Sequence, residues 1–187
     1  LFKQDGELKA NFIKAEKAIA RSLRDPLFQE YMSGEKQVIM TGELFGSKWK
    51  IKMDSYHPGR AIVDLKYMQS LTKFGYVPDI GYLDFVRYWG YDLQGAIYQE
   101  IVYQNTGKRL PFYIAGISKE EAMNIEVIYI HDNYLKEAMK VIESRMPRIL
   151  QVKYHGAKPD RCEQCIWCRD TKVLTKPIGI GDLTASL

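Results

Sequence analysis

The sequence lacks the features of membrane-spanning, secreted and disordered chains. It has no run of 18 or more apolar residues, so it predicts no transmembrane helix. It begins with Leu-Phe-Lys-Gln, without an apolar signal segment and without an initiating Met, and we expect a piece of a longer protein cut before residue 1. With 46% hydrophobic residues and 13 tyrosines among 187 residues, it predicts one folded domain over 1–187.

Cysteine is scarce and confined to one place. Cys162, Cys165 and Cys168 lie within seven residues, which excludes a usual disulfide framework and indicates a reducing, cytoplasmic location. The net charge is also small, because 27 basic residues against 23 acidic ones leave only +4. That surplus does not by itself identify a nucleic-acid-binding protein. Most of it lies around the cysteines, so the sequence predicts a basic, cysteine-bearing C-terminal tail over 151–187.

Hydrophobic periodicity predicts a mixed α/β domain. Apolar residues three and four apart indicate helices with one buried face, and alternation around Trp49, Ile51 and Met53 indicates a β-hairpin. Asp25-Pro26 ends the first helix, because the residue before a proline is pushed out of the helical conformation. The expected helices cover 7–24, 26–32, 82–104 and 133–150, and the expected strands cover 36–45, 48–54, 61–66, 112–117 and 125–130, the first three antiparallel.

The candidate chemistry lies in the second and third expected strands. Residues two apart in a strand share a face, so Asp64 and Lys66 project together while Val63 and Leu65 are expected to enter the core. The turn between the strands can bring Asp54 beside Asp64. Two adjacent carboxylates suit Mg²⁺, and a lysine beside them can orient a water or stabilise charge on a phosphate. The set predicts metal-assisted phosphodiester hydrolysis, and a solvated charge pair is the alternative.

The order of these residues resembles a known nuclease signature. Asp54 followed by Asp64-Leu65-Lys66 is similar to the motif of the PD-(D/E)xK superfamily. Gln94 and Tyr98, four apart and therefore on one helix face, resemble the Q-x-x-x-Y helix motif of its RecB-type and RecE-type members. The segment 15–66 and the cysteine-bearing tail are more similar to the RecE (exonuclease VIII) branch, which prophages carry. The similarity covers about residues 10–170.

That resemblance implies a fold, an activity and partners. The fold is a restriction-endonuclease-like core, α/β (α+β), in which helices flank a mixed central sheet with antiparallel hairpins. The activity is that of a Mg²⁺- or Mn²⁺-dependent exodeoxyribonuclease, which degrades one strand of double-stranded DNA from its end, 5′ to 3′, for recombination by strand annealing. Such enzymes form rings around DNA, so the resemblance implies a homo-oligomer and a single-strand annealing protein as a partner.

The resemblance also implies a role for each site residue. Asp54 and Asp64 would bind the metal with the Leu65 carbonyl as a third ligand, and Lys66 would be the catalytic lysine. Gln94 and Tyr98 would line the site and hold a phosphate or the DNA end. An upstream acidic residue is also expected, and Glu35 and Glu43 both remain candidates, with Glu43 as a possible metal ligand. The histidine that this branch carries on an earlier helix does not precede Asp54 here.

The cysteines form a second candidate metal site. Three thiolates are good ligands for Zn²⁺ or an iron–sulfur cluster, and a structural site usually has four ligands. His155 is a candidate fourth ligand for zinc. Some RecB-type nucleases hold a [4Fe–4S] cluster with three C-terminal cysteines and one N-terminal cysteine, and unliganded thiols are the remaining alternative. Two other functions stay open, namely a Cas4/RecB-like nuclease with an iron–sulfur cluster and a non-catalytic DNA-binding module of the same fold.

Overall fold

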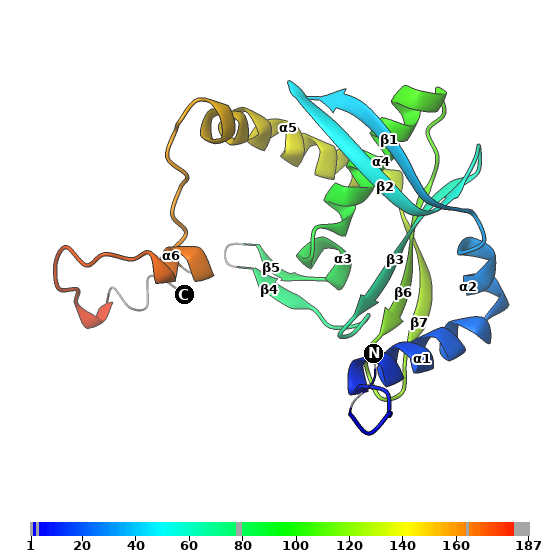
Figure 1. The fold of residues 1–187 in the computed structure, drawn as a ribbon. Coiled ribbons are helices and arrows are strands. Elements are labelled where there is room, and N and C mark those ends of the chain that lie inside the picture. The colour runs from blue at the N-terminus through cyan, green and yellow to red at the C-terminus, as the bar shows by residue number, and fades with distance from the viewer. Residues whose placement is uncertain (1, 3, 78–79, 164, 182–187) are drawn as a thin grey trace. The chain divides into compact units, whose positions relative to one another are not determined.

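The computed structural model describes residues 2, 4–77, 80–163 and 165–181 of the chain (Figure 1). Contacts divide the chain into two compact units, Leu1–Arg145 and Met146–Leu187. The boundary lies close to the predicted start of the basic tail. Within the described ranges, no helix has both the length and the apolar character needed to cross a membrane.

A five-stranded mixed sheet forms the centre of the first unit. Strands β1 (Glu35–Leu44), β2 (Ser47–His57), β3 (Ala61–Met68), β6 (Phe112–Ser118) and β7 (Ile125–Ile130) lie in the order β1-β2-β3-β6-β7. All neighbours are antiparallel except β3 and β6, which run parallel because helices connect them. The predicted mixed sheet with antiparallel hairpins is confirmed.

Two tight turns set the register of the first three strands. Phe45 and Gly46 both have positive φ, 49° and 76°, as a two-residue hairpin turn of the primed type requires. Pro58 and Gly59 form the second turn, which the Arg60 amide closes by donating to the His57 carbonyl at 2.9 Å. The first turn pairs residues from Leu44 with Ser47 to Glu35 with Tyr56, and this register places Gln37 across from Asp54.

Helices cover both faces of this sheet (Figure 1). Helices α1 (Ala10–Leu23) and α2 (Pro26–Tyr31) pack on one face, where Ala18 and Phe28 join a buried cluster with Val63. Asp25 caps α2 by accepting the Phe28 amide at 2.9 Å, with Pro26 as the first helical residue. Helix α4 (Tyr91–Thr106) lies on the other face, so close to β6 that a Cβ on Gly95 would lie 2.6 Å from the Phe112 ring.

The single helix predicted over 82–104 is wrong, because the structure divides this segment. A small hairpin of β4 (Gly75–Val77) and β5 (Gly81–Leu83) comes first and is followed by the short helix α3 (Phe85–Tyr88). Asp84 caps α3 by accepting the Arg87 amide at 3.1 Å. Gly90 then adopts a left-handed φ of 67°, which ends α3 and starts α4 in a new direction.

The second unit is basic and mostly irregular. Helix α5 (Asp132–Tyr154) begins in the first unit and ends in the second, so it runs past its predicted end at 150. The Arg148 guanidinium pairs with Asp160 at 2.8 Å and donates to the Lys158 carbonyl at 2.6 Å, which folds the following segment back along the helix end. Helix α6 (Ile166–Asp170) lies beyond this segment and carries the last cysteine.

Candidate active site

The candidate site forms where β2 and β3 separate. The two strands pair from His57 with Ala61 to Ser55 with Val63, and the same register continued by one residue places Asp54 across from Asp64. A side chain bridges the strands at this point, because the Leu65 amide donates to Asp54 Oδ2 at 2.9 Å. The predicted meeting of the two aspartates is therefore present in the structure.

Asp64 is the most buried polar group of the site. Its Oδ1 accepts a hydrogen bond from Gln94 Nε2 at 2.8 Å, and its Oδ2 forms an ion pair with Lys66 Nζ at 2.5 Å. The Asp64 side chain is 5% exposed and that of Lys66 is 18% exposed. Burial, with a smaller contribution from the neighbouring Asp54 carboxylate, raises the pKa of Asp64, and the contacts with Lys66 and Gln94 oppose that rise.

Gln94 joins the acid and the base of the site. It lies in the first turn of α4, donates to Asp64 through its nitrogen, and accepts from Lys66 Nζ through its oxygen at 2.9 Å. Both ends of its amide are therefore engaged within the protein. The structure shows Gln94 as a residue that positions Asp64 and Lys66, and the predicted contact with a phosphate stays a prediction.

Tyr98 contacts the neighbouring strand. Its hydroxyl donates to the Lys52 carbonyl on β2 at 3.0 Å, and its ring meets Phe112 edge to face with centroids 6.0 Å apart. The contact ties α4 to the strand that carries Asp54, two residues from that aspartate. The predicted role of Tyr98 in holding a phosphate stays a prediction.

Three other predicted residues lie at different distances from the aspartates. Leu65 is 40% exposed, so its expected place in the core is wrong, and the metal contact predicted for its carbonyl stays a prediction. The structure separates Glu43 from the site. Glu43 pairs with Lys48 and lies six residues, or about 20 Å, along β1 from Gln37, the residue across from Asp54. Glu35, across from Tyr56 and two residues from Gln37, is the nearer of the two candidate acids.

Comparison with known proteins identifies the family. A family model described as a PDDEXK-like domain of unknown function (DUF3799) matches residues 1–171. The chain belongs to the PDDEXK-like family. A crystal structure from Eubacterium rectale, described as a putative exonuclease, is 64% identical with a TM-score of 0.91, and the match covers 100% of this chain and 70% of that chain. No curated protein sequence matches the chain. The predicted superfamily and its restriction-endonuclease-like fold are confirmed, and both findings support a nuclease.

The PDDEXK site fits a divalent cation. Asp64 Oδ2 is buried and, within the part of the chain that the structure describes, has no hydrogen-bond partner besides its ion pair with Lys66. Asp54 supplies a second carboxylate across the strand pair. Mg²⁺ and Mn²⁺ prefer such oxygen ligands and relieve the repulsion between two carboxylates. Asp54 and Asp64 would therefore hold the ion that this family usually uses.

Two residues of the PDDEXK site were missed from the sequence. Gln37 donates to Asp54 Oδ1 at 2.9 Å, and its backbone has a left-handed φ of 55°. Counting residues from the Phe45–Gly46 turn would have predicted that Gln37 lies across from Asp54. Tyr91 presents its ring 4.5 Å from Lys66 Nζ. It lies one turn before the predicted Gln94, but tyrosine in an apolar helix pattern carried no separate signal.

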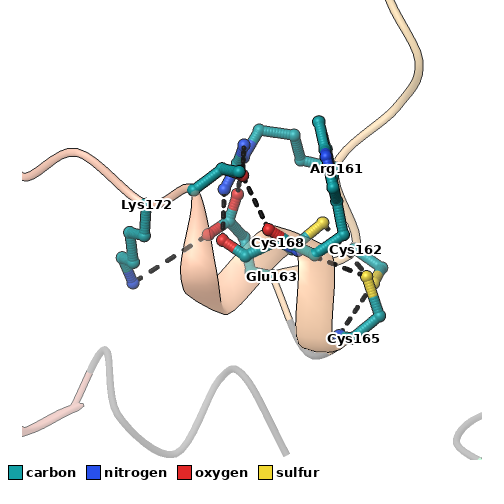
Figure 2. A network of polar contacts seen from close by, with 8 residues as sticks. Arg161, Cys162, Glu163, Cys165, Cys168 and Lys172 are labelled. Carbon is teal, nitrogen blue, oxygen red and sulfur yellow. Dashed lines mark hydrogen bonds and ion pairs between the residues drawn. The ribbon is translucent and has the colours of Figure 1, made fainter.

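The three cysteines converge in the second unit of this PDDEXK protein (Figure 2). Their sulfurs lie within 4.8 Å of one another, and those of Cys162 and Cys168 are 3.8 Å apart. The Cys165 amide donates to Cys162 Sγ at 3.3 Å, and the Cys168 amide donates to Cys165 Sγ at 3.4 Å. Burial raises the pKa of the Cys168 thiol. A three-cysteine group that could hold a metal ion is therefore present, and its donor set fits zinc or an iron–sulfur cluster.

His155 does not join this group. Among the described residues, the cluster of potential metal ligands contains only the three cysteines, and the His155 amide donates to the Gln151 carbonyl at the end of α5. The zinc site predicted with His155 as its fourth ligand is therefore not assembled in the structure. Arg161 supports the cysteine loop, because it pairs with Glu163 at 2.6 Å and lies 5.2 Å from the Trp167 ring (Figure 2 shows the ion pair).

Proposed function

We propose that the protein is a metal-dependent exodeoxyribonuclease that hydrolyses phosphodiester bonds of double-stranded DNA from its ends. The observation that carries this proposal is the convergence of Asp54 and Asp64 at the point where β2 and β3 separate, with Lys66 held beside them. The PDDEXK-like family and the neighbour described as a putative exonuclease support a nuclease. The duplex substrate, the attack from ends and the dependence on Mg²⁺ or Mn²⁺ are our own proposals.

Each polar side chain of the site has a task in this proposal. A bound divalent cation supplies positive charge to a phosphate and lowers the pKa of a bound water. Asp54 and Asp64 hold that cation. The Lys66 ammonium has three donors, of which Asp64 and Gln94 engage two, so one remains for a phosphate oxygen or a water. Gln94 fixes the spacing of the acid and the lysine, and Gln37 and the Leu65 amide hold the two oxygens of Asp54.

The test compares linear and circular duplex DNA in the presence of Mg²⁺ or Mn²⁺. We expect the protein to degrade linear DNA and to leave closed circles intact. Asp64→Asn, which keeps the shape of the side chain and removes its charge, should abolish degradation. Glu43→Gln is the matched control, because this carboxylate lies far from the site, and it should degrade DNA at the wild-type rate.

Two outcomes would replace the proposal. Cleavage of closed circles that depends on Asp64 would indicate an endonuclease. Binding of DNA without any cleavage, by a protein that contains the full natural chain and is supplied with either metal, would indicate a non-catalytic DNA-binding module. End-labelled duplexes give the strand polarity in the same assay, for which 5′ to 3′ is our expectation.

For the cysteine loop we propose a bound metal centre. The support is the close approach of the three sulfurs, which lie within 4.8 Å of one another, and the pair of amide-to-sulfur hydrogen bonds that hold two of them in place. Elemental analysis of protein purified without oxygen should find zinc or iron, and Cys165→Ser should lose it. Iron with visible absorption would favour the Cas4/RecB-like alternative, zinc without it would indicate a structural site, and neither metal would refute the proposal.

The assembly and partners are proposals as well. A homo-oligomer around duplex DNA, a single-strand annealing protein as partner and a role in recombination follow from the RecE-type resemblance, and the cytoplasmic location follows from the use of cysteine. Sedimentation of the protein with and without a DNA duplex tests the first of these. A monomer under both conditions would contradict the ring assembly.

A further inference from the structure

An aromatic cavity lies beside the candidate active site. It has a volume of about 510 Å³ and is formed by the end of β3, the loop that follows it up to the first residue of β4, α3, the start of α4 and Lys119 after β6. We call it the aromatic groove and define it by the lining residues Tyr67, Lys73, Phe74, Tyr88, Trp89 and Lys119. None of these residues takes part in the site described above.

The aromatic groove adjoins the proposed active site, with Tyr91 between the two. Tyr91 lines the groove, and its ring also lies 4.5 Å from Lys66 Nζ. Lys66 in turn pairs with Asp64. One side chain, that of Tyr91, therefore separates the groove from Lys66, so the groove is next to the place where a bound strand would meet Asp64.

The rings of the groove are exposed and held in place. Trp89 is 62% exposed, and Tyr88 and Phe74 are exposed as well. Tyr88 meets Trp89 edge to face with centroids 5.2 Å apart. Tyr88 also rests on the backbone of Gly75, where an added Cβ would lie 2.1 Å from the ring. Clustered exposed aromatic side chains indicate a binding surface, because burying them elsewhere would be favourable.

The charge of the groove favours a polyanion. Lys73 and Lys119 line it, and the Lys119 ammonium lies 5.0 Å from the Tyr67 ring, with Glu120 as the acidic neighbour of Lys73. Flat aromatic rings between lysines match the bases and phosphates of a single strand, since every base has a face that stacks. A second copy of the chain is a poorer occupant, because lysine is depleted at protein–protein interfaces.

We propose that the aromatic groove binds the unpaired bases of a DNA strand whose phosphates reach the candidate active site. Trp89 and Tyr88 stack on bases, and Lys73 and Lys119 contact phosphates. This inference rests on the proposed nuclease function and adds that one strand of the substrate is separated from its partner next to the site. Duplex DNA has no free base faces inside its stack, so only a single-stranded segment can use the rings.

The test measures binding of a labelled single-stranded oligonucleotide by fluorescence anisotropy. All proteins carry Asp64→Asn to prevent cleavage. Trp89→Ala should weaken binding about 5-fold or more, the loss expected for one stacking ring, and Trp89→Phe should restore most of it. Tyr103→Ala is the matched control, because Tyr103 is an exposed tyrosine on α4 that stacks against Arg109 instead, and it should bind normally.

An oligonucleotide that carries abasic sugars separates stacking from charge. It should bind weakly to the parent protein and should not respond to Trp89→Ala. Equal binding of the ordinary oligonucleotide by the parent and by Trp89→Ala would overturn the proposal. An equal loss of affinity for the ordinary and the abasic strand would also overturn it. A change of oligomeric state in Trp89→Ala without a change in DNA binding would overturn it as well and would identify a second copy as the occupant.

A parallel cleavage assay without Asp64→Asn distinguishes the two proposals. If wild-type protein degrades DNA, and Trp89→Ala degrades and binds it equally well, the groove proposal fails and the nuclease stands. If wild-type protein cleaves no DNA but binds single strands in a Trp89-dependent way, the nuclease fails and the groove stands. We expect Trp89→Ala to raise KM and to leave kcat within about 2-fold, because stacking lies outside the reacting atoms.

Discussion

The ion pair between Lys66 and Asp64 gives the sharpest quantitative prediction. Lys66→Met removes one partner of a pair whose side chains are 18% and 5% exposed. Breaking a buried pair costs about 3–5 kcal/mol, because the remaining charge stays buried without compensation. Gln94 still donates to Asp64, so we expect the lower end, about 3 kcal/mol. At about 2–4 °C per kcal/mol for a chain of this size, the midpoint of thermal unfolding should fall by about 6–12 °C at neutral pH.

The stability that Lys66→Met loses relative to wild type should decrease as the pH is lowered. Burial already raises the pKa of Asp64 above its ordinary 3.8, so the folded state is stabilised by protonation at low pH and loses that stabilisation as pH rises through the raised value. Removing Lys66 takes away a contact that opposes the rise, and the pKa of Asp64 should rise further. The difference between Lys66→Met and wild type should therefore be largest at neutral pH and should shrink on acidification.

Two controls decide the interpretation. Lys140→Met breaks a surface pair with Glu137 whose side chains are 69% and 70% exposed, and it should change stability by less than about 1 kcal/mol. The double variant Asp64→Asn with Lys66→Met should recover most of the lost stability, because no buried charge remains. An unchanged melting midpoint for Lys66→Met, or a double variant that loses the sum of both single effects, would refute the reasoning.

Three further variants test other contacts of the site. Gln37→Gly should relieve about 1 kcal/mol of left-handed strain, which offsets the about 1 kcal/mol lost with the hydrogen bond to Asp54, so stability in urea unfolding should change little while cleavage falls because Asp54 loses a donor. A parallel fall in stability and cleavage would contradict this. Gly95→Ala should lower the thermal midpoint through about 1–3 kcal/mol of overpacking against Phe112, and an unchanged midpoint would show that α4 docks less closely. Tyr98→Phe should cost about 1 kcal/mol in urea unfolding, with its hydrogen bond to β2 lost, and no cost would mean that the bond contributes nothing.

The sequence predicts the strands of the site well because their side chains alternate over a fixed period. The turn at Pro58-Gly59 then sets the register, which brings Asp54 across from Asp64. The residue type alone could not decide whether Glu35 or Glu43 belongs to the site, since both are acidic residues of β1. Counting from the Phe45–Gly46 turn would have excluded it, because that count pairs Glu43 with Lys48 and places Gln37 beside Asp54.

The division of the segment after β3 could not be predicted from its pattern. Phe85, Tyr88 and Tyr91 keep a helical spacing through Gly90, so periodicity alone favours one continuous helix. The break depends on a backbone angle, the left-handed φ of Gly90, and on the cap that Asp84 provides. The sequence also could not show whether His155 joins the three cysteines, since its spacing along the chain does not determine the direction of the chain after α5.

The spacing of Gln94 and Tyr98 has a geometric cause that the fold explains. Four residues advance a helix by about 6 Å, slightly more than the roughly 4.8 Å between neighbouring strands. Helix α4 crosses the sheet, so Gln94 contacts Asp64 on β3 and Tyr98, one turn later, contacts Lys52 on β2. Asn105, about two turns beyond Tyr98, donates to the Thr41 carbonyl on β1 at 2.9 Å. Gln94 and Tyr98 therefore fix the distance between β3, which carries Asp64, and β2, which carries Asp54. In this way Tyr98 contributes to the position of the two aspartates, although only Gln94 contacts one of them.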